Sequence, residues 1–177
     1  MRSALPDGQG ETAVFREMKR KRQLLSREES ESILARGTSG VLALSGEGGW
    51  PYAVPLSYLY TAGKIYFHCA KEGYKMEAIA RDSRASFCVI DRDQVVPEKM
   101  TTYFRSAIAF GRIRVVEDED AKKKALRALG SRYSAPGNSA AVEKEVEQQL
   151  PQVCILEFTV EQLTGKESIE LVKARGG

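Results

Sequence analysis

The chain has 177 residues, of which 42% are hydrophobic and 29% charged, and its formal net charge is +3. This length corresponds to one domain that can bury a continuous core, and the composition is that of an ordinary globular protein. The small net charge argues against a dedicated nucleic-acid binder. A local basic run at residues 16–22 fits a solvated arm or helix start better than a phosphate-binding surface. Phosphate binding by this run remains the alternative interpretation.

Apolar runs in this chain are all much shorter than the roughly 20 residues of a membrane span. The basic residues near the N-terminus are not followed by the apolar stretch of a signal peptide. We therefore expect no membrane association and a cytoplasmic location.

The three cysteines, Cys69, Cys88 and Cys154, are widely separated and lie in apolar, strand-like settings. They are expected to be reduced core thiols. Because the chain has no Cys-x-x-Cys pair and only one histidine, no metal site is predicted.

Residues 1–14 show no periodicity and are expected to form an extended or disordered arm. A single domain is expected to follow at residues 15–175. Ser26 and Glu29 form a capping box that starts a short helix ending at Gly37. Strands are predicted at residues 40–44, 52–60, 65–70, 85–90, 103–116 and 152–160. Helices are predicted at 75–80, 118–130 and 140–150, the second of them capped by Asp118. The polar residues 91–102 suggest a crossover or a lid. Six strands with helices inserted late predict an α+β fold built on an antiparallel β-barrel, with the helices at its periphery.

Two residues within predicted strands carry positional information. Pro55 cannot donate to a strand ladder, so its strand is expected at a sheet edge, at a bulge or beside a ligand. Gly111 interrupts the longest strand, and the apolar residues change parity there, from Ile108 and Phe110 to Ile113. This pattern predicts a bulge at which the inward face of the strand changes.

A strand-to-helix junction at residues 68–75 carries the first candidate site. His68 ends an apolar strand, a glycine follows, and Tyr74 and Lys75 open a probable helix whose backbone N–H groups face the junction. A phosphate is well accommodated by a lysine and helix N-terminal N–H groups. The alternative is that Lys75 is only a solvated first-turn residue.

The segment at residues 103–111 carries the second candidate site. Arg105 and Ser106 begin an apolar strand, where a guanidinium can bind phosphate oxygens through two hydrogen bonds and a hydroxyl can add a third. Ser106 and Tyr74 are the weaker candidates, because hydroxyl groups in such places often form only local bonds.

These two segments, together with residues 51–58 and 163–167, resemble the flavin-binding split-barrel family related to pyridoxamine 5'-phosphate oxidase, and within it the Nim-type nitroimidazole-resistance branch. The resemblance runs from Met18 to Lys173 and keeps the order of all four segments. It implies a split barrel, flavin mononucleotide (FMN) as cofactor, a homodimer with the flavin at the interface, and a small-molecule electron acceptor such as a nitroaromatic. The implied cofactor-binding residues are Val54, Pro55, Leu56, Ser57, His68, Ala70, Tyr74, Lys75, Arg105, Ser106 and Lys166.

His68 is the only histidine, so any imidazole acid–base chemistry must use it. The resemblance places it in the active-site cleft as a catalytic residue, and the alternative is that it only hydrogen-bonds the cofactor or the backbone. Lys166 is near the cofactor by resemblance, although a lysine in a turn is the simpler interpretation. The chain ends without the C-terminal histidine of true pyridoxamine phosphate oxidases, so that substrate is not expected. A non-catalytic flavin- or haem-binding module and a deazaflavin-dependent relative are the other functions left open.

Overall fold

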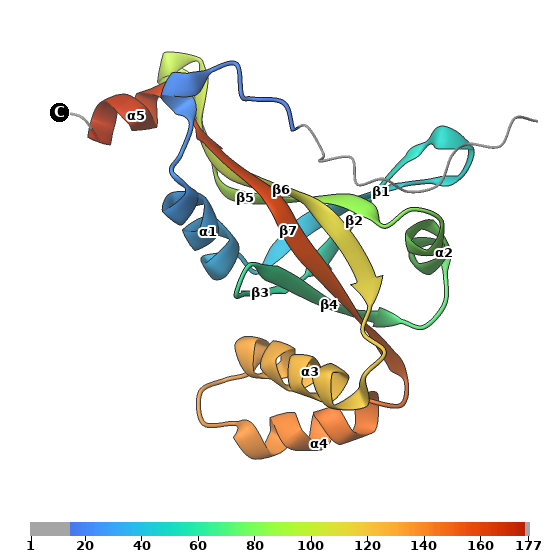
Figure 1. Cartoon of the computed structure of the whole chain (residues 1–177). Coiled ribbons are helices and arrows are strands. Elements are labelled where there is room, and N and C mark those ends of the chain that lie inside the picture. The colour runs from blue at the N-terminus through green and yellow to red at the C-terminus, as the bar shows by residue number, and fades with distance from the viewer. Residues whose placement is uncertain (1–14, 176–177) are drawn as a thin grey trace, which may run out of the picture.

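The computed structural model describes residues 15–175, and the predicted arm at residues 1–14 lies outside the described residues. Seven antiparallel strands form one strongly curled sheet in the order β2-β1-β5-β6-β7-β4-β3 (Figure 1). The strands are β1 Ser39–Ser45, β2 Pro51–Ser57, β3 Leu59–Thr61, β4 Lys64–Ala70, β5 Arg84–Val96, β6 Thr101–Val115 and β7 Val153–Glu167. The helices are α1 Arg27–Arg36, α2 Tyr74–Arg81, α3 Glu119–Tyr133, α4 Ser139–Gln149 and α5 Ile169–Arg175, with short 3₁₀ turns at Lys21–Gln23, Glu47–Gly49 and Pro97–Lys99. The α+β class is confirmed, and none of the helices within residues 15–175 is both long and apolar enough to cross a bilayer.

The prediction of six strands was wrong by one, because the expected strand at residues 52–60 is two strands. The break falls at Tyr58, whose backbone N–H donates to Tyr133 Oη at 2.9 Å. Its backbone carbonyl accepts from the same hydroxyl at 2.8 Å. A side chain from α3 thus takes both backbone groups that a neighbouring strand would otherwise bond. The sheet is consequently not closed, since β2 and β3 are its two edges.

The edge position predicted for the strand of Pro55 is confirmed. Pro55 pairs with Val41 of β1, and among the described residues 15–175 β2 has no strand on its other side. The half-buried Tyr52, Val54 and Leu56 pack against the core, whereas the alternate residues of β2 are exposed. This alternation leaves a face of small side chains uncovered at the sheet edge.

The loop predicted at residues 91–102 was also wrong. β5 continues to Val96 and pairs with β6 as far as Thr101, so the two strands form a long hairpin with a bulge between Ile90 and Arg92. This end of the hairpin extends beyond the core, and most of its β5 residues are exposed (Figure 1). Without a buried face, the strand has no alternation of polar and apolar residues from which it could be recognised.

The bulge predicted at Gly111 is present, but the extra residue lies in the neighbouring strand. Phe110 pairs with Gln162 and Gly111 with Val160, so Glu161 of β7 is left out of the register. A Cβ atom at Gly111 would come within 1.9 Å of the Thr159 carbonyl oxygen, which explains why a glycine is needed there. The predicted change of inward face was wrong, because Ala107, Ala109, Gly111 and Ile113 are all buried along β6.

The helices cover different parts of the sheet. The capping box of α1 is confirmed, with Glu29 N–H donating to Ser26 Oγ at 3.1 Å and Ser26 N–H to Glu29 Oε2 at 2.8 Å. The Asp118 cap of α3 is confirmed as well, but α3 runs past Gly130 to Tyr133. The α3–α4 hairpin packs on β3, β4 and β7 through a second apolar cluster that includes Leu126. Figure 1 shows this hairpin on the opposite side of the molecule from α5. Helix α5 was not predicted from the sequence.

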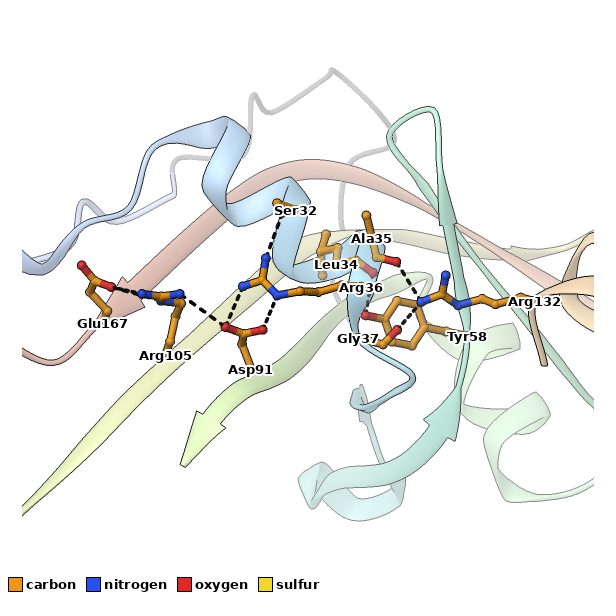
Figure 2. Close-up of polar contacts among 10 residues, drawn as sticks. All are labelled: Ser32, Leu34, Ala35, Arg36, Gly37, Tyr58, Asp91, Arg105, Arg132 and Glu167. Atoms are coloured by element: carbon orange, nitrogen blue, oxygen red, sulfur yellow. Dashed lines mark hydrogen bonds and ion pairs between the residues drawn. The ribbon is translucent and has the colours of Figure 1, made fainter. Parts of the chain in front are cut away.

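Tyr58 also ties the sheet to α1 through its fully buried side chain. Its hydroxyl donates to the Leu34 carbonyl, one of the helix-end carbonyls that lack a partner within the helix, at 2.7 Å. Arg132 donates to the Ala35 and Gly37 carbonyls at 2.8 and 2.5 Å (Figure 2). Two side chains distant in sequence therefore complete the C-terminal end of α1.

Replacing Tyr58 by phenylalanine is expected to lower the free energy of unfolding by about 1–2 kcal/mol, because the Leu34 carbonyl loses its buried donor. Urea unfolding measures the change. Tyr103→Phe is the matched control, since its hydroxyl accepts a hydrogen bond from the exposed Lys99, and about 0.5 kcal/mol or less is expected there. Equal losses in the two variants would contradict this account of the helix end.

Candidate functional site

Strand register gathers most of the predicted cofactor residues on one face of the sheet, which we call the outer face. Pro55, Val41, Cys88, Ile108 and Thr164 are successive cross-strand partners from β2 to β7 and therefore point to the same side. Following the ladders further, the predicted residues on this face are Pro55, Ser57, His68, Ala70, Ser106 and Lys166. Val54 and Leu56 point to the inner side instead, where they pack against the core.

The outer face is divided by the α3–α4 hairpin into a covered and an open part. Over β4 and the start of β7, Tyr66 and Ile155 pack against the hairpin. Over β5 and β6 the Phe15 ring packs on Phe110 at 5.7 Å between ring centroids, but most of the face is open, and Ile90, Ile108 and Phe110 are 67%, 38% and 39% exposed. Large apolar side chains on an uncovered sheet face mark a binding surface rather than an ordinary solvent boundary.

A cavity of about 440 Å³ lies where the hairpin meets the sheet, and it brings two predicted site residues together. His68 and Ser57 line its sheet side, while Leu126, Leu129 and Tyr133 line its helical side. His68 is exposed to this space. The cavity therefore combines an imidazole and a hydroxyl with an apolar wall, which is the pattern of a small-molecule site.

Ser106 and Lys166 are direct cross-strand partners on the open part of the outer face. The prediction of a turn at Lys166 was wrong, because β7 continues through it to Glu167. The Lys166 ammonium lies 5.3 Å from the centre of the Phe104 ring. A lysine and a hydroxyl side by side could bind an anion there.

Tyr74 and Lys75 lie in the first turn of α2, beside the hairpin between β1 and β2. The Tyr74 hydroxyl accepts from the Glu47 N–H at 2.6 Å, and its ring packs edge-on against Tyr52 at 4.8 Å between centroids. Lys75 is half-buried. Figure 1 shows α2 at the end of the sheet opposite α1, so Lys75 and Arg105 do not meet within one chain.

Arg105 occupies a different environment from Ser106, its neighbour in sequence. Its side chain lies beside α1, where its Nε donates to Glu167 Oε2 at 3.0 Å and its guanidinium lies 3.8 Å from Asp91 Oδ2 (Figure 2). Arg36 of α1 forms a two-pronged pair with the same aspartate, at 2.5 and 2.6 Å. The Glu167 side chain is fully buried and is also paired with Arg175 of α5. The Arg105 charge is thus already balanced by carboxylates.

Sequence reasoning missed a second cavity, of about 620 Å³, on the same outer face between α3 and the β3–β4 hairpin. Glu157, which is nearly buried, accepts hydrogen bonds from Lys64, Tyr66 and Arg114 at 2.8–3.0 Å. Burial, and then the hydrogen bond with Glu157, raise the pKa of Tyr66 to about 12. The only available signal was a glutamate among apolar residues of a strand, because its partners come from two other strands.

A family model for pyridoxamine 5'-phosphate oxidase matches residues 26–167, which is most of the chain and includes both the outer face and the His68 cavity. The chain belongs to the pyridoxamine 5'-phosphate oxidase family. The resemblance inferred from the four sequence segments is therefore confirmed at the level of the family. A search of the curated proteins found no match to this chain.

Solved structures share the fold of this oxidase-family chain. A candidate 5-nitroimidazole antibiotic resistance protein from Bacteroides thetaiotaomicron is 23% identical, with a TM-score of 0.66 over 81% of this chain and 86% of that one. A FAD- and haem-binding protein from Mycobacterium smegmatis is 24% identical, with a TM-score of 0.69 over 86% and 78%. A FAD-binding protein from Mesorhizobium loti is also 24% identical, with a TM-score of 0.61 over 82% and 97%. At these identities the likeness establishes a common fold.

Proposed function

We propose that this member of the family is a flavoprotein of the Nim-like branch that binds FMN and reduces a small molecule such as a nitroaromatic. The observation that carries the proposal is the outer face, where an exposed row of small residues on β2 continues toward exposed Ile90, Ile108 and Phe110. The small side chains of β2 would let a planar aromatic ring lie close against the strand, and the exposed apolar side chains beside it match the mostly apolar lining of small-molecule sites. The neighbouring FAD-binding proteins of the same fold support a flavin as the ligand.

The residues on the outer face have distinct roles in this proposal. Pro55 and Ser57 border the flavin ring, and Val54 and Leu56 reach it only through their backbone groups. The pair of Ser106 and Lys166 offers a hydroxyl and a cation to an anionic part of the cofactor. The small side chain of Ala70 leaves space for the cofactor on the same face, beside His68.

A bound flavin would supply two-electron reduction of the acceptor. His68 would hold a proton at its imidazole and deliver it to the acceptor inside the 440 Å³ cavity. Leu126 and Leu129 would exclude water from one side of that acceptor. Ser57 would orient the acceptor by hydrogen bonding.

We also propose a homodimer whose interface includes the open part of the outer face. Exposed Ile90, Ile108 and Phe110 would be covered there. A second subunit could also bring its α2 toward the first subunit's outer face, so that Lys75 would join a phosphate site which a single chain leaves incomplete. The cytoplasmic location stays a prediction.

Removing Lys75 or Lys166 is expected to weaken FMN binding about tenfold and riboflavin binding little, because a charge-assisted bond to a phosphate contributes about 1.5–3 kcal/mol. Titration followed by flavin fluorescence measures both affinities. Lys144→Ala is the control, since this lysine is exposed on α4, which packs on α3. FMN affinities within twofold of the parent in both variants would remove the phosphate site from the proposal.

A haem- or flavin-binding module without catalysis is the second candidate. His68 is exposed beside the apolar side chains of the cavity, as an axial haem ligand would have to be, and the relative from Mycobacterium smegmatis binds haem as well as FAD. The absorption spectrum of the purified protein distinguishes haem, flavin and deazaflavin. Turnover of a nitroimidazole by the flavin-loaded protein then separates a reductase from a flavin-binding module without catalysis.

A further inference from the structure

Two of the three cysteines face each other across neighbouring strands. Cys69 of β4 and Cys154 of β7 are direct partners in the antiparallel ladder. Both belong to the inner side of the sheet, where Cys154 is 7% exposed and Cys69 packs against the same core cluster. The third cysteine, Cys88, pairs with Ile108 on the outer face, away from the other two.

The ladder geometry sets the separation of the two cysteines. The Val160 N–H donates to the Gly63 carbonyl at 3.1 Å, and hydrogen-bonded pairs recur at every second residue from there, so Cys69 and Cys154 form such a pair. The Cα atoms of such pairs are about 5.5 Å apart, inside the range of about 4.4–6.8 Å that a disulfide bridges. Their Cβ atoms lie at the wide end of the cross-strand range, so a disulfide here would be strained and readily reduced.

A cavity makes the Cys154 thiol accessible to a small oxidant. A cavity of about 270 Å³ reaches this residue and is also lined by Lys71, Met76 and Lys122. Burial keeps the pKa of Cys154 above its usual value, although the neighbouring Cys69 and the charge of Lys122 offset part of the rise. Burial raises the pKa of Cys69 to about 11. Because the cavity reaches Cys154, this thiol is expected to meet the oxidant first, and Cys69 is in place to resolve the product.

We propose that Cys69 and Cys154 form a reversible two-electron redox site that a peroxide oxidises to a cross-strand disulfide. The Cys154 sulfur attacks a peroxide oxygen, the O–O bond breaks, and a sulfenic acid and one water result. The Cys69 sulfur then attacks the Cys154 sulfur, forming the S–S bond as the S–O bond breaks, and the departing oxygen leaves as a second water. The two thiol protons end in the two waters. This site does not depend on the proposed flavin.

The pairing can be read from tryptic peptides of the native protein after exposure to hydrogen peroxide. Trypsin places Cys69, Cys88 and Cys154 on three different peptides, residues 65–71, 85–92 and 145–166. We expect a linked pair of peptides 65–71 and 145–166 in non-reducing mass spectrometry, with loss of two hydrogen atoms. Treatment with dithiothreitol should restore the separate peptides, and circular dichroism should show that the protein stayed folded.

Single substitutions identify the partners. Cys88→Ser should leave the linked pair unchanged, whereas Cys69→Ser and Cys154→Ser should each abolish it. Failure to find peptides 65–71 and 145–166 linked in the unsubstituted protein would overturn the proposal, whether the cysteines stay reduced or become sulfinic acids. Links through Cys88 at equal abundance would overturn it too, because they would show no selection by the strand register.

Discussion

Replacing Arg105 by alanine should lower the free energy of unfolding by about 3 kcal/mol, because breaking a buried ion pair leaves a charge without its partner. Glu167 is fully buried, and Arg105 donates a hydrogen bond to it from Nε at 3.0 Å and forms an ion pair with it through a terminal nitrogen at 2.9 Å. Arg175 also pairs with Glu167, which keeps the expected loss below that of an isolated buried carboxylate. Denaturant unfolding at neutral pH measures the difference.

Two comparison variants make this expectation specific. Arg27→Ala removes an exposed pair with Glu31 at i, i+4 and should cost about 0.5 kcal/mol or less. Adding Glu167→Gln to Arg105→Ala should recover part of the loss, because the buried carboxylate that keeps only Arg175 as a partner is then neutral. If Arg105→Ala is as stable as Arg27→Ala and instead loses FMN affinity, Arg105 is a phosphate ligand, as the sequence motif predicts.

Replacing His68 by alanine should lower the turnover of the acceptor about a hundredfold while flavin affinity changes little, since a positioned acid–base group contributes on that order. His68 is exposed in the cavity that Ser57 and the α3–α4 hairpin complete. The rate–pH profile should also lose a step, because the variant has no imidazole to carry the proton. Stopped-flow absorbance of the reduced flavin, mixed with a nitroimidazole or a quinone, measures the rate.

His68→Gln separates proton transfer from hydrogen bonding at this position. Glutamine can still hydrogen-bond but does not transfer protons near neutral pH, so it should be as slow as the alanine variant. If the glutamine variant keeps the parental rate, or if the alanine variant is slow only until it is saturated with added flavin, the imidazole has a binding role. The dithiol of Cys69 and Cys154 lies on the inner side and should not respond to either variant.

Local signals in the sequence predicted the parts of the fold that depend on neighbouring residues. The Ser26 capping box and the Asp118 cap were both predicted from residues within three positions of each other. Pro55 predicted an edge strand because it lacks a backbone donor. The motifs at residues 68–75 and 103–111, taken in order with their neighbours, were enough to indicate the family that the model of residues 26–167 confirms.

Local sequence patterns indicated most of the helices and strands, the family and the residue types at the site, whereas the folded arrangement selects which of those residues share a face. Arg105 and Ser106 are adjacent in the chain, yet Arg105 turns to Glu167, 62 positions away, and Ser106 lies on the outer face opposite Lys166. The Tyr133 hydroxyl interrupts the strand at Tyr58 from 75 positions away. Such partners are chosen by sheet register and helix packing, whose energies come from contacts between distant segments, and no local pattern records them.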